Sequence, residues 1–280
     1  MLSQQRIVFV GPGVMGEAIV VGLLARAGVP PDRIRMAGPR PERLEELAAR
    51  HHVATTTDNR AAVADADIVV ISVKPQSLGP VLAQLHGAIP AGAMVLSIVA
   101  GARLSDISGH LEHPAIARAM PNTPAQIGEG ITVWTVTAGV SEVQKALARE
   151  VLASLGKEVF AEDEEYLDMA TALSGTGPAY VFLFMEAMVD AGVHLGFPRR
   201  IAEELVVQTV RGSVAFYEHS PSHLARLRNQ VTSPAGTTAA ALYYLDKAGF
   251  RPAISRAIWA AYERSVQLGR GKKRAPVGND

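Results

Sequence analysis

The chain has 280 residues, 48% of them hydrophobic and 19% charged, and its 27 basic and 27 acidic side chains leave no formal net charge at pH 7. This balance gives no overall field that would favour nucleic acid or an anionic membrane, and no uninterrupted hydrophobic run approaches the ~20 residues of a membrane span. The absence of cysteine excludes disulfides, thiolate metal sites and a cysteine nucleophile. We expect a soluble, cytoplasmic protein with one large or two medium-sized domains.

The most informative stretch is residues 7–22, where four hydrophobic residues run into Gly11, Gly13 and Gly16 and an amphipathic segment follows. A buried strand, a tight turn and a helix start are the context that a dinucleotide-binding fingerprint requires. Gly11 would make the turn, Gly13 would let a pyrophosphate approach the backbone, and Gly16 would let the helix pack closely. The N–H groups at the helix start would face the phosphates. The alternative is a glycine-rich turn that binds no ligand.

The first part of the chain alternates short hydrophobic runs with helical patterns, which predicts βαβ units on a Rossmann-type, doubly wound parallel sheet. The expected strands are Arg6–Val10, Arg33–Ala37, Ile68–Ser72, Met94–Ile98, Ala115–Ala119 and Ile131–Val136. The expected helices are Gly13–Ala27, Pro41–His51, Asn59–Ala64, Leu78–Leu85 and Ser141–Leu155. The last of these begins with a capping-box pattern, because Gln144 follows Ser141 by three residues.

Strand signals stop after about residue 162, and the rest of the chain is predicted to be helical. The expected helices are Tyr166–Leu173, Pro178–Leu195, Arg199–His219, Ser222–Val231, Thr237–Ala248 and Arg251–Leu268. We therefore expect a dinucleotide-binding domain over residues 1–162 and an all-α domain over residues 163–280. The acidic run at residues 162–165 is interpreted as a solvated connection between them.

The helix expected at Pro178–Leu195 is hydrophobic on nearly every side, which indicates burial on all sides. A helical domain of about 110 residues has little volume to bury several such helices alone. We therefore predict that another subunit completes this C-terminal domain. A compact monomeric bundle is the alternative.

The end of the second expected strand bears on the choice of cofactor. It reads Ala37-Gly38, with no carboxylate to bond the ribose 2′-hydroxyl of NAD. Arg40 follows in the loop, and an arginine there can bind a 2′-phosphate with two hydrogen bonds. This pattern favours NADPH, with NADH as an alternative cofactor. The alternative interpretation of Arg40 is a solvated charge before the next helix.

Four further loops carry groups suited to chemistry. Residues 72–75 and 120–124 follow strands, at the sheet edge where ligands bind in open α/β folds, and Lys74 is either a catalytic group or a solvated lysine. Residues 231–238 place hydroxyls and free N–H groups at a helix start, which can bind a carboxylate or can be an ordinary cap. Residues 174–180 begin another helix or form a close-packed elbow.

Five motifs follow one another along the chain: Gly11-Pro-Gly-Val-Met-Gly16, Ser72-Val-Lys-Pro75, Met120-Pro-Asn-Thr-Pro124, Ser174-Gly-Thr-Gly-Pro-Ala-Tyr180 and Val231-Thr-Ser-Pro-Ala-Gly-Thr-Thr238. In this order, they resemble pyrroline-5-carboxylate reductase. The resemblance extends to about Leu268. It implies a Rossmann domain followed by a helical dimerisation domain, and NAD(P)H-dependent reduction of the cyclic imine 1-pyrroline-5-carboxylate to L-proline, the last step of proline biosynthesis. It further implies a homodimer or a ring of dimers, such as a homodecamer.

The resemblance also implies the site residues. The cofactor would contact Gly11, Gly13, Val14, Met15, Gly16, Gly38, Arg40, Asn59, Ser72, Val73, Lys74 and Pro75. The substrate would contact Asn122, Ser174, Gly175, Ser233, Gly236, Thr237 and Thr238. Thr238, reaching towards the ring nitrogen, and Lys74 are the candidate catalytic residues. Ala235, Pro221 and Asn229 depart from the commoner residues of the family, and Ala235 is expected to be tolerated.

Other functions are weighed against this one. His219 and His223 have a metal-like spacing, but Pro221 lies between them and we expect no metal site. The β-hydroxyacid dehydrogenases, and related imine reductases, share the two-domain plan, but those dehydrogenases use a lysine on an interdomain helix, and 178–195 contains none. A non-catalytic dinucleotide-binding sensor would have no use for the loop at 233–238.

Overall fold

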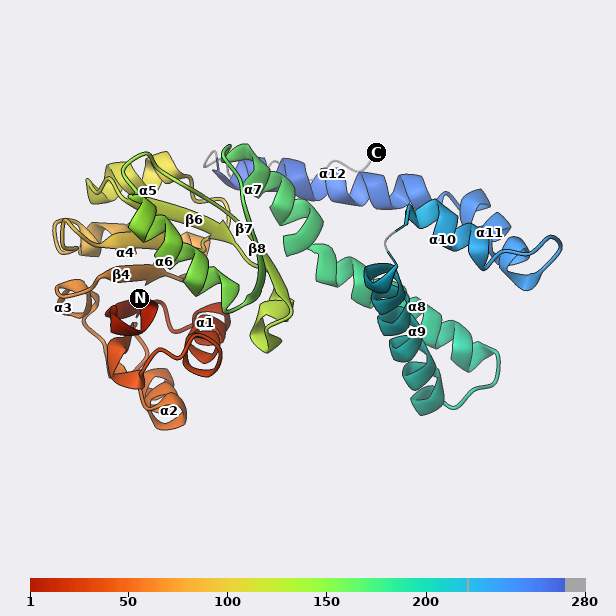
Figure 1. Cartoon of the computed structure of the whole chain (residues 1–280), viewed down its shortest axis with the longest axis horizontal. Helices are drawn as coiled ribbons and strands as arrows, with labels where there is room; N and C mark the ends of the chain where they lie inside the picture. Colours follow the sequence, from red (N-terminus) through yellow and green to blue (C-terminus); the bar gives the residue numbers. More distant parts are fainter. Residues whose placement is uncertain (221, 270–280) are drawn as a thin grey trace. The chain divides into compact units, whose positions relative to one another are not determined.

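The computed structural model describes residues 1–220 and 222–269 (Figure 1). The chain forms two compact units: the first comprises residues 1–176 together with the C-terminal stretch from residue 261, and the second comprises residues 177–260. These units are defined by packing, so the division into functional domains at residues 162 and 163 stays a prediction.

An eight-stranded sheet with the order β3-β2-β1-β4-β5-β6-β7-β8 forms the centre of the first unit. Its strands are β1 (Ile7–Val10), β2 (Ile34–Ala37), β3 (Ala54–Thr56), β4 (Ile68–Ile71), β5 (Met94–Ser97), β6 (Ile116–Met120), β7 (Gly130–Val136) and β8 (Gly156–Phe160). Neighbouring strands are parallel except β6 and β7, which pair antiparallel, and β8 runs parallel to β7. The expected Rossmann-type sheet is therefore confirmed, with its last two strands reversed.

Helices follow most strands of this unit. They are α1 (Val14–Ala25), α2 (Pro41–His51), α3 (Asn59–Val63), α4 (Leu78–Leu85), α5 (Leu104–Leu111), α6 (Glu142–Ala153) and α7 (Glu165–Ala170), with a π-helix at Thr171–Gly175. The capping box that starts α6 is confirmed: the Ser141 hydroxyl accepts the Gln144 N–H, and the Gln144 side chain accepts the Ser141 N–H at 2.9 Å.

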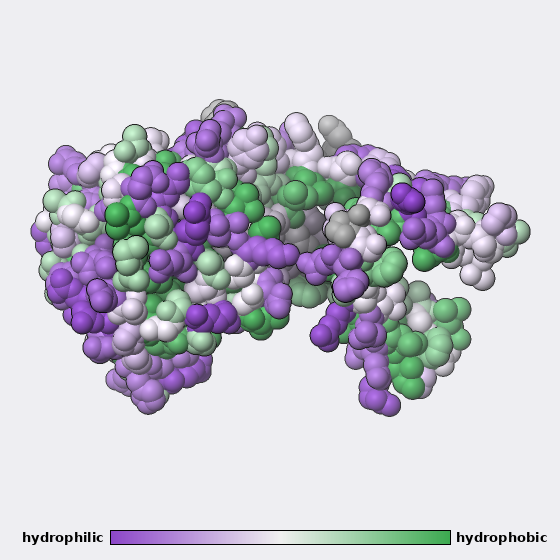
Figure 2. Space-filling view, viewed as in Figure 1, coloured by the Kyte–Doolittle hydropathy of each residue, from purple (hydrophilic) through white to green (hydrophobic). Residues whose placement is uncertain are grey.

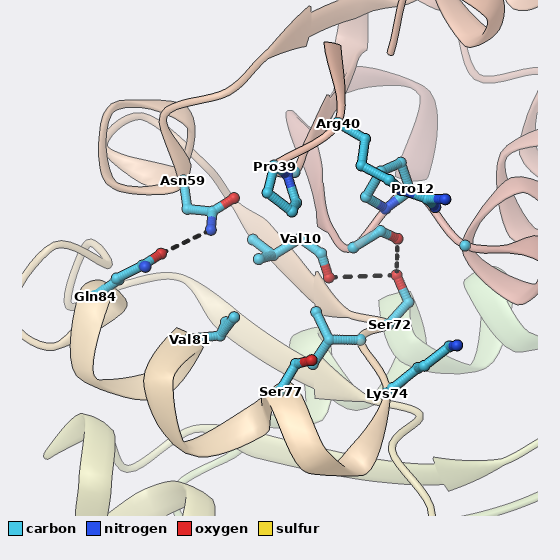
Figure 3. Close-up of a pocket in the computed structure, with 14 residues that line it drawn as sticks. Val10, Pro12, Pro39, Arg40, Asn59, Ser72, Lys74, Ser77, Val81 and Gln84 are labelled. Carbon is cyan, nitrogen blue, oxygen red and sulfur yellow. Dashed lines mark hydrogen bonds between the residues drawn. The ribbon is translucent and has the colours of Figure 1, made fainter. Parts of the chain in front are cut away.

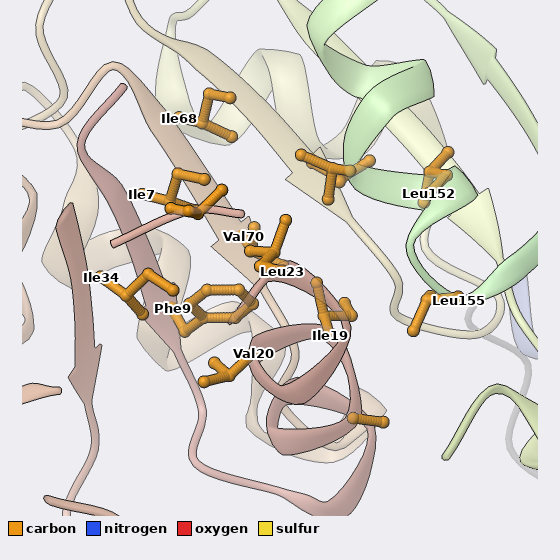
Figure 4. Packing of buried hydrophobic residues seen from close by; sticks show 14 of the residues in the cluster. Ile7, Phe9, Ile19, Val20, Leu23, Ile34, Ile68, Val70, Leu152 and Leu155 are labelled. Atoms are coloured by element: carbon orange, nitrogen blue, oxygen red, sulfur yellow. The ribbon is translucent and has the colours of Figure 1, made fainter. Parts of the chain in front are cut away.

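The core of this unit lies on both faces of the sheet. In β1, Ile7 and Phe9 pack into a cluster with α1 and α6 (Figure 4), whereas Val8 and Val10 belong to a second cluster that includes Leu85 of α4. Alternate residues of one strand are thus buried on opposite faces, which explains its uninterrupted hydrophobic sequence.

A buried charged cluster corrects one expectation about the acidic run at residues 162–165. Arg118 of β6 has a side chain only 4% exposed, and it pairs with Glu164 at 2.7 Å and with Asp168 at 3.6 Å. Glu164 also accepts the Leu104 N–H at 2.7 Å, and the Ser265 hydroxyl donates to Asp168 at 2.7 Å. Glu164 is therefore a structural partner of β6 and α5 rather than part of a solvated connection.

The second unit is entirely helical over its described residues, as expected. It contains α8 (Gly177–His194), α9 (Arg199–His219), α10 (Leu224–Gln230), α11 (Thr237–Lys247) and the start of α12 (Phe250–Gly269). Its only buried cluster among the described residues consists of Val189, Ala202 and Val206, with three partly buried neighbours. Figure 2 shows hydrophobic side chains gathered over α8 and hydrophilic ones over α9.

Length and composition alone would let one helical stretch cross a membrane. This stretch, Glu165–His194, is the only one among the described residues, and 11% of its most hydrophobic window is buried. A single stretch of this kind is weak evidence, because core helices of soluble proteins meet the same criterion.

Candidate cofactor and substrate sites

A cavity of about 440 Å³ opens where β1, β2 and β4 end at their carboxyl sides (Figure 3). This is the edge of an open α/β sheet at which ligands bind. The lining residues are Val10, Gly11, Pro12, Gly13, Gly38, Pro39, Arg40, Asn59, Ser72, Val73, Lys74, Ser77, Val81 and Gln84.

The three glycines of the fingerprint have different steric surroundings. Gly11 has φ +109°, and a Cβ on it would lie 2.7 Å from the Ser72 carbonyl carbon; a Cβ on Gly16 would lie 2.7 Å from the Ser72 hydroxyl. A Cβ on Gly13 would meet nothing closer than the Ser72 carbonyl oxygen at 3.7 Å. Backbone conformation and close packing thus require the first and third glycines, while Gly13 leaves open space that a ligand can use.

Ser72 holds the glycine loop in place. Its hydroxyl donates to the Gly11 carbonyl oxygen at 2.8 Å and, more weakly, to the Val10 carbonyl oxygen at 3.4 Å (Figure 3). Its N–H also donates to the Val10 carbonyl oxygen, at 2.9 Å. Since the hydroxyl proton is used inside the protein, Ser72 lines the cavity mainly as a support for the loop.

The loop after β2 packs directly on the glycine loop. A Cβ on Gly38 would lie 2.3 Å from Pro12 Cδ, and Arg43 Nε donates to the Pro12 carbonyl oxygen at 3.3 Å. Arg40 lies between Gly38 and Arg43 in the sequence. It lines the cavity and has no ion pair among the described residues. It is therefore a cation available for an anionic ligand.

The side chain of Glu17 in α1 anchors α2 to this region. It pairs with Arg43, with Arg50 at 2.7 Å and with His51 at 2.9 Å. Burial raises the pKa of Glu17, but the hydrogen bonds from His51, Arg43 and Arg50 outweigh this effect, and the pKa falls below its ordinary value. A charged Glu17 thus fixes Arg43, and Arg43 fixes the glycine loop.

Several residues predicted for the cofactor site do not line the cavity, and the lining includes others that were not predicted. Val14, Met15, Gly16 and Pro75 are absent from the lining, although Val14 and Met15 begin α1, whose first N–H groups lack intrahelical partners. Ser77, Val81 and Gln84 were missed. Their i, i+4, i+7 spacing places them on one face of a helix, and this pattern was available in the sequence.

The residues predicted to bind the substrate lie in both units. In the second unit, Gly236 is the N-cap of α11, and the hydroxyls of Ser233, Thr237 and Thr238 have no hydrogen-bond partner among the described residues. A Cβ on Gly236 would lie 2.3 Å from the Ser233 hydroxyl. Free hydroxyls and unpaired N–H groups at the start of an 11-residue helix can donate hydrogen bonds to a bound carboxylate.

Ala235, in the same loop, adopts φ +57°. Alanine in this left-handed conformation costs roughly 1 to 2 kcal/mol relative to its usual backbone. Alanine therefore brings backbone strain to this loop, and its tolerance at this position stays a prediction. Pro221, the second departure from the family pattern, lies outside the described residues.

In the first unit, Asn122 connects three segments. Its Oδ1 accepts the Ile131 N–H at 3.0 Å, and its Nδ2 donates to the Ser174 carbonyl oxygen at 3.2 Å. The Ser174 hydroxyl donates to the Ala170 carbonyl oxygen at 2.9 Å, and a Cβ on Gly175 would lie 2.8 Å from Met120 Cε. Asn122 therefore supports the π-helix that contains Ser174 and Gly175, and π-helical turns are frequent at functional sites.

No group of three or more histidine, aspartate or glutamate side chains that could hold a metal occurs in the described part of the chain. Lys74 is exposed at the rim of the cavity, as the N-cap of a short 3₁₀-helix.

Comparison with known proteins matches the two parts of the chain to two family models. Residues 6–101 match the "NADP oxidoreductase coenzyme F420-dependent" family, and residues 164–268 match "Pyrroline-5-carboxylate reductase dimerisation". Pyrroline-5-carboxylate reductase of Synechocystis is 40% identical over 264 residues, covering 93% of this chain and 97% of the relative.

Two solved structures are similar over nearly the whole chain. Pyrroline-5-carboxylate reductase from Coxiella burnetii is 35% identical, with a TM-score of 0.87, and the match covers 94% of this chain and 98% of that one. The Plasmodium falciparum pyrroline carboxylate reductase, solved with NADP bound, is 30% identical, with a TM-score of 0.88 and coverage of 95% and 99%. The chain therefore belongs to the pyrroline-5-carboxylate reductase family.

Proposed function

We propose that this chain reduces 1-pyrroline-5-carboxylate to L-proline with NADPH bound in the cavity beside the glycine loop. As a member of its family, the chain is an NAD(P)-dependent oxidoreductase of proline biosynthesis. The observation that carries the proposal is the cavity itself, because it combines an open glycine loop with the uncommitted cation Arg40.

The cavity residues fit a phosphorylated dinucleotide. Gly11, Gly13 and the first N–H groups of α1, at Val14 and Met15, would hold the diphosphate. Arg40 would bind the 2′-phosphate, and Asn59 would lie near the adenosine. Val73, Lys74 and Pro75 would flank the nicotinamide, which supplies a hydride to the imine carbon when the cofactor is bound.

The loop before α11 would bind the substrate carboxylate. Ser233, Thr237 and Thr238 offer hydroxyls without partners among the described residues, and Gly236 and the helix start offer N–H groups. Holding the carboxylate fixes the five-membered ring, and this positioning would supply much of the rate acceleration.

The imine nitrogen must carry a proton when it accepts the hydride. A cyclic imine can take this proton from water near neutral pH, so the site needs no histidine or glutamate with a shifted pKa. Thr238 would orient the nitrogen or pass on a proton. Lys74, exposed at the rim of the cavity, is the second candidate catalytic residue. Asn122 would hold the π-helix that contains Ser174 and Gly175 in place for contact with the substrate.

The dimerisation family model supports a homo-oligomer. We further propose a ring of dimers such as a homodecamer, a cofactor domain over residues 1–162, a dimerisation domain over residues 163–280, and a cytoplasmic location.

The activity is tested by following NADPH oxidation after adding 1-pyrroline-5-carboxylate to the purified full chain, with NADH in a parallel assay. We expect rapid turnover with NADPH. Reduction of NADP+ by an added 3-hydroxyacid, with no oxidation of NADPH by 1-pyrroline-5-carboxylate, would favour a β-hydroxyacid dehydrogenase. NADPH binding without turnover of either substrate would favour a sensor.

A further inference from the structure

The wall of the cofactor cavity contains a buried polar atom without a partner. Asn59 is the first residue of α3, and its Oδ1 is buried and accepts no hydrogen bond from the residues that the structure describes. A buried acceptor loses its bonds to water, so an unpaired one is costly unless a ligand supplies a donor. Since Asn59 lines the cavity, a bound cofactor is the natural source of that donor.

The other end of the same amide is already fixed. Asn59 Nδ2 donates to Gln84 Oε1 at 2.8 Å, and this bond links the start of α3 to α4 across the cavity wall (Figure 3). An amide whose nitrogen is bound to Gln84 must turn its oxygen the other way. Gln84 thereby decides whether Asn59 presents an acceptor or a donor to the cavity.

Both residues stand on an anchored backbone. Asp58 caps α3 by accepting the N–H groups of Arg60 and Ala61 at 2.9 and 3.0 Å. Arg60 Nη1 donates to the carbonyl oxygens of His86 at 2.9 Å and Gln84 at 3.3 Å, which ties the end of α4 to α3. The two amides therefore meet in a fixed geometry.

We infer that Gln84 is a positioning residue for cofactor binding: it orients the Asn59 amide so that Oδ1 accepts a hydrogen bond from the adenosine end of NADPH. The donor is either the 6-amino group of adenine or a ribose hydroxyl. The inference rests on the proposed placement of the cofactor in this cavity.

The test measures the dissociation constant of NADPH for the full-length protein by fluorescence titration. Gln84→Met removes the acceptor, and we expect affinity to fall about 2- to 10-fold, the effect of one amide hydrogen bond at a partly exposed site. Gln4→Met, a matched change at an exposed position outside the cavity, should leave affinity unchanged.

Two charged variants separate orientation from electrostatics. Gln84→Glu can only accept, so it should hold Asn59 as Gln84 does and keep affinity within about 2-fold of the wild type. Gln84→Lys can only donate, so it should turn the amide and weaken binding by at least as much as Gln84→Met. Simple attraction of the anionic cofactor predicts the opposite order, with Lys strengthening and Glu weakening binding, and that result would overturn the inference.

The hypoxanthine analogue of NADPH, which carries an oxygen in place of the 6-amino group, identifies the donor. If the 6-amino group is the donor, Gln84→Met should no longer weaken binding of the analogue. If a ribose hydroxyl is the donor, the same 2- to 10-fold loss should persist. Either result supports the inference.

Asn59→Ala and Arg40→Ala show whether the cofactor placement itself is at fault. If both leave the NADPH dissociation constant unchanged, the cavity does not bind the cofactor and the proposed placement fails. If they weaken binding while every Gln84 variant equals the wild type, the placement holds and only the role of Gln84 is rejected.

Discussion

The two compact units bury their hydrophobic residues to very different extents. In the first, β1 alone contributes Ile7, Val8, Phe9 and Val10, all at most 1% exposed, to clusters on both faces of the sheet. In the second, Phe182 and Leu183 of α8 are 64% and 67% exposed, although they are just as hydrophobic.

This contrast shows which unit is complete in one chain. The first unit buries its own hydrophobic core, and its residues alone line the cavity beside the glycine loop. The second buries a cluster of Val189, Ala202 and Val206 and leaves much of α8 uncovered. A hydrophobic patch of this kind marks an interaction surface, and the dimerisation family model over residues 164–268 indicates that the partner is another copy of the chain.

The largest effect on catalysis is expected in the second unit. Thr238→Ala removes the hydroxyl proposed to orient the imine nitrogen, and we expect kcat to fall roughly 10- to 1000-fold. Thr238→Ser keeps the hydroxyl and should recover most of the activity. Steady-state kinetics with saturating NADPH measures both, and an unchanged kcat in Thr238→Ala would remove this residue from the mechanism.

A cofactor effect is expected in the first unit. Arg40→Ala removes a charge-assisted contact to the 2′-phosphate, so NADPH should bind about 10- to 100-fold more weakly, while NADH changes little. Titration of both cofactors checks this, with Arg33→Ala as an exposed control outside the cavity. Equal losses for both cofactors would discard the assignment of Arg40.

The stability of the first unit should depend on the charge of Glu17. Glu17→Gln should lower the free energy of unfolding at pH 7 by about 1 to 2 kcal/mol, because Arg43, Arg50 and His51 lose a charged partner. The pKa of Glu17 lies below its ordinary value of 4.5, so its contribution is complete above that pH and is lost as the pH falls through the lowered pKa.

Urea unfolding of the wild type and of Glu17→Gln, at fixed protein concentration and at a series of pH values from neutral to acid, measures how the free energy of unfolding depends on pH. The difference between the two proteins should be constant above about pH 5 and shrink as the pH falls through the lowered pKa of Glu17. A difference that grows on acidification would contradict the direction of the pKa shift.

The smallest effect is expected in the loop before α11, in the second unit. Ala235→Gly relieves the strain of a positive φ but adds freedom to the unfolded chain, so stability should rise by less than about 1 kcal/mol. Ala241→Gly, in the exposed interior of α11, should instead lower stability by about 1 kcal/mol. Thermal unfolding of both variants makes the comparison, and destabilisation by Ala235→Gly would indicate that the loop is not strained.

The sequence predicts those helices and strands in which buried positions appear as a continuous run or a regular repeat of hydrophobic residues. Strands β1, β4 and β5 are hydrophobic on both faces, and the capping box of α6 is local chemistry. Strand β3 reads Ala-Thr-Thr and β8 reads Gly-Lys-Glu-Val-Phe; both lie at sheet edges, where half-exposed residues give no such run. Helix α5 was also missed, because its Ser and Gly residues are weak helix formers.

The direction of β7 could have been predicted. Only residues 121–129, with one short 3₁₀-helix, separate β6 from β7, and a parallel pair needs a longer crossover. In the candidate site, Gly11 follows from the glycine motif and Arg40 from its loop position, whereas Asn59 was expected only from the family resemblance. The bond between Asn59 and Gln84 depends on packing of α3 against α4, which no local pattern in the sequence reveals.

The difference between the two units is tested most directly by the molecular mass in solution, measured by sedimentation over a range of protein concentrations. The wild type should sediment as a dimer or a multiple of it. Phe182→Asp on α8 should dissociate it, since an unpaired charge buried in an interface is strongly unfavourable. Val143→Asp, at an exposed hydrophobic residue of the first unit, should leave the mass unchanged. A monomeric wild type, or a Phe182→Asp variant with the wild-type mass, would contradict the account.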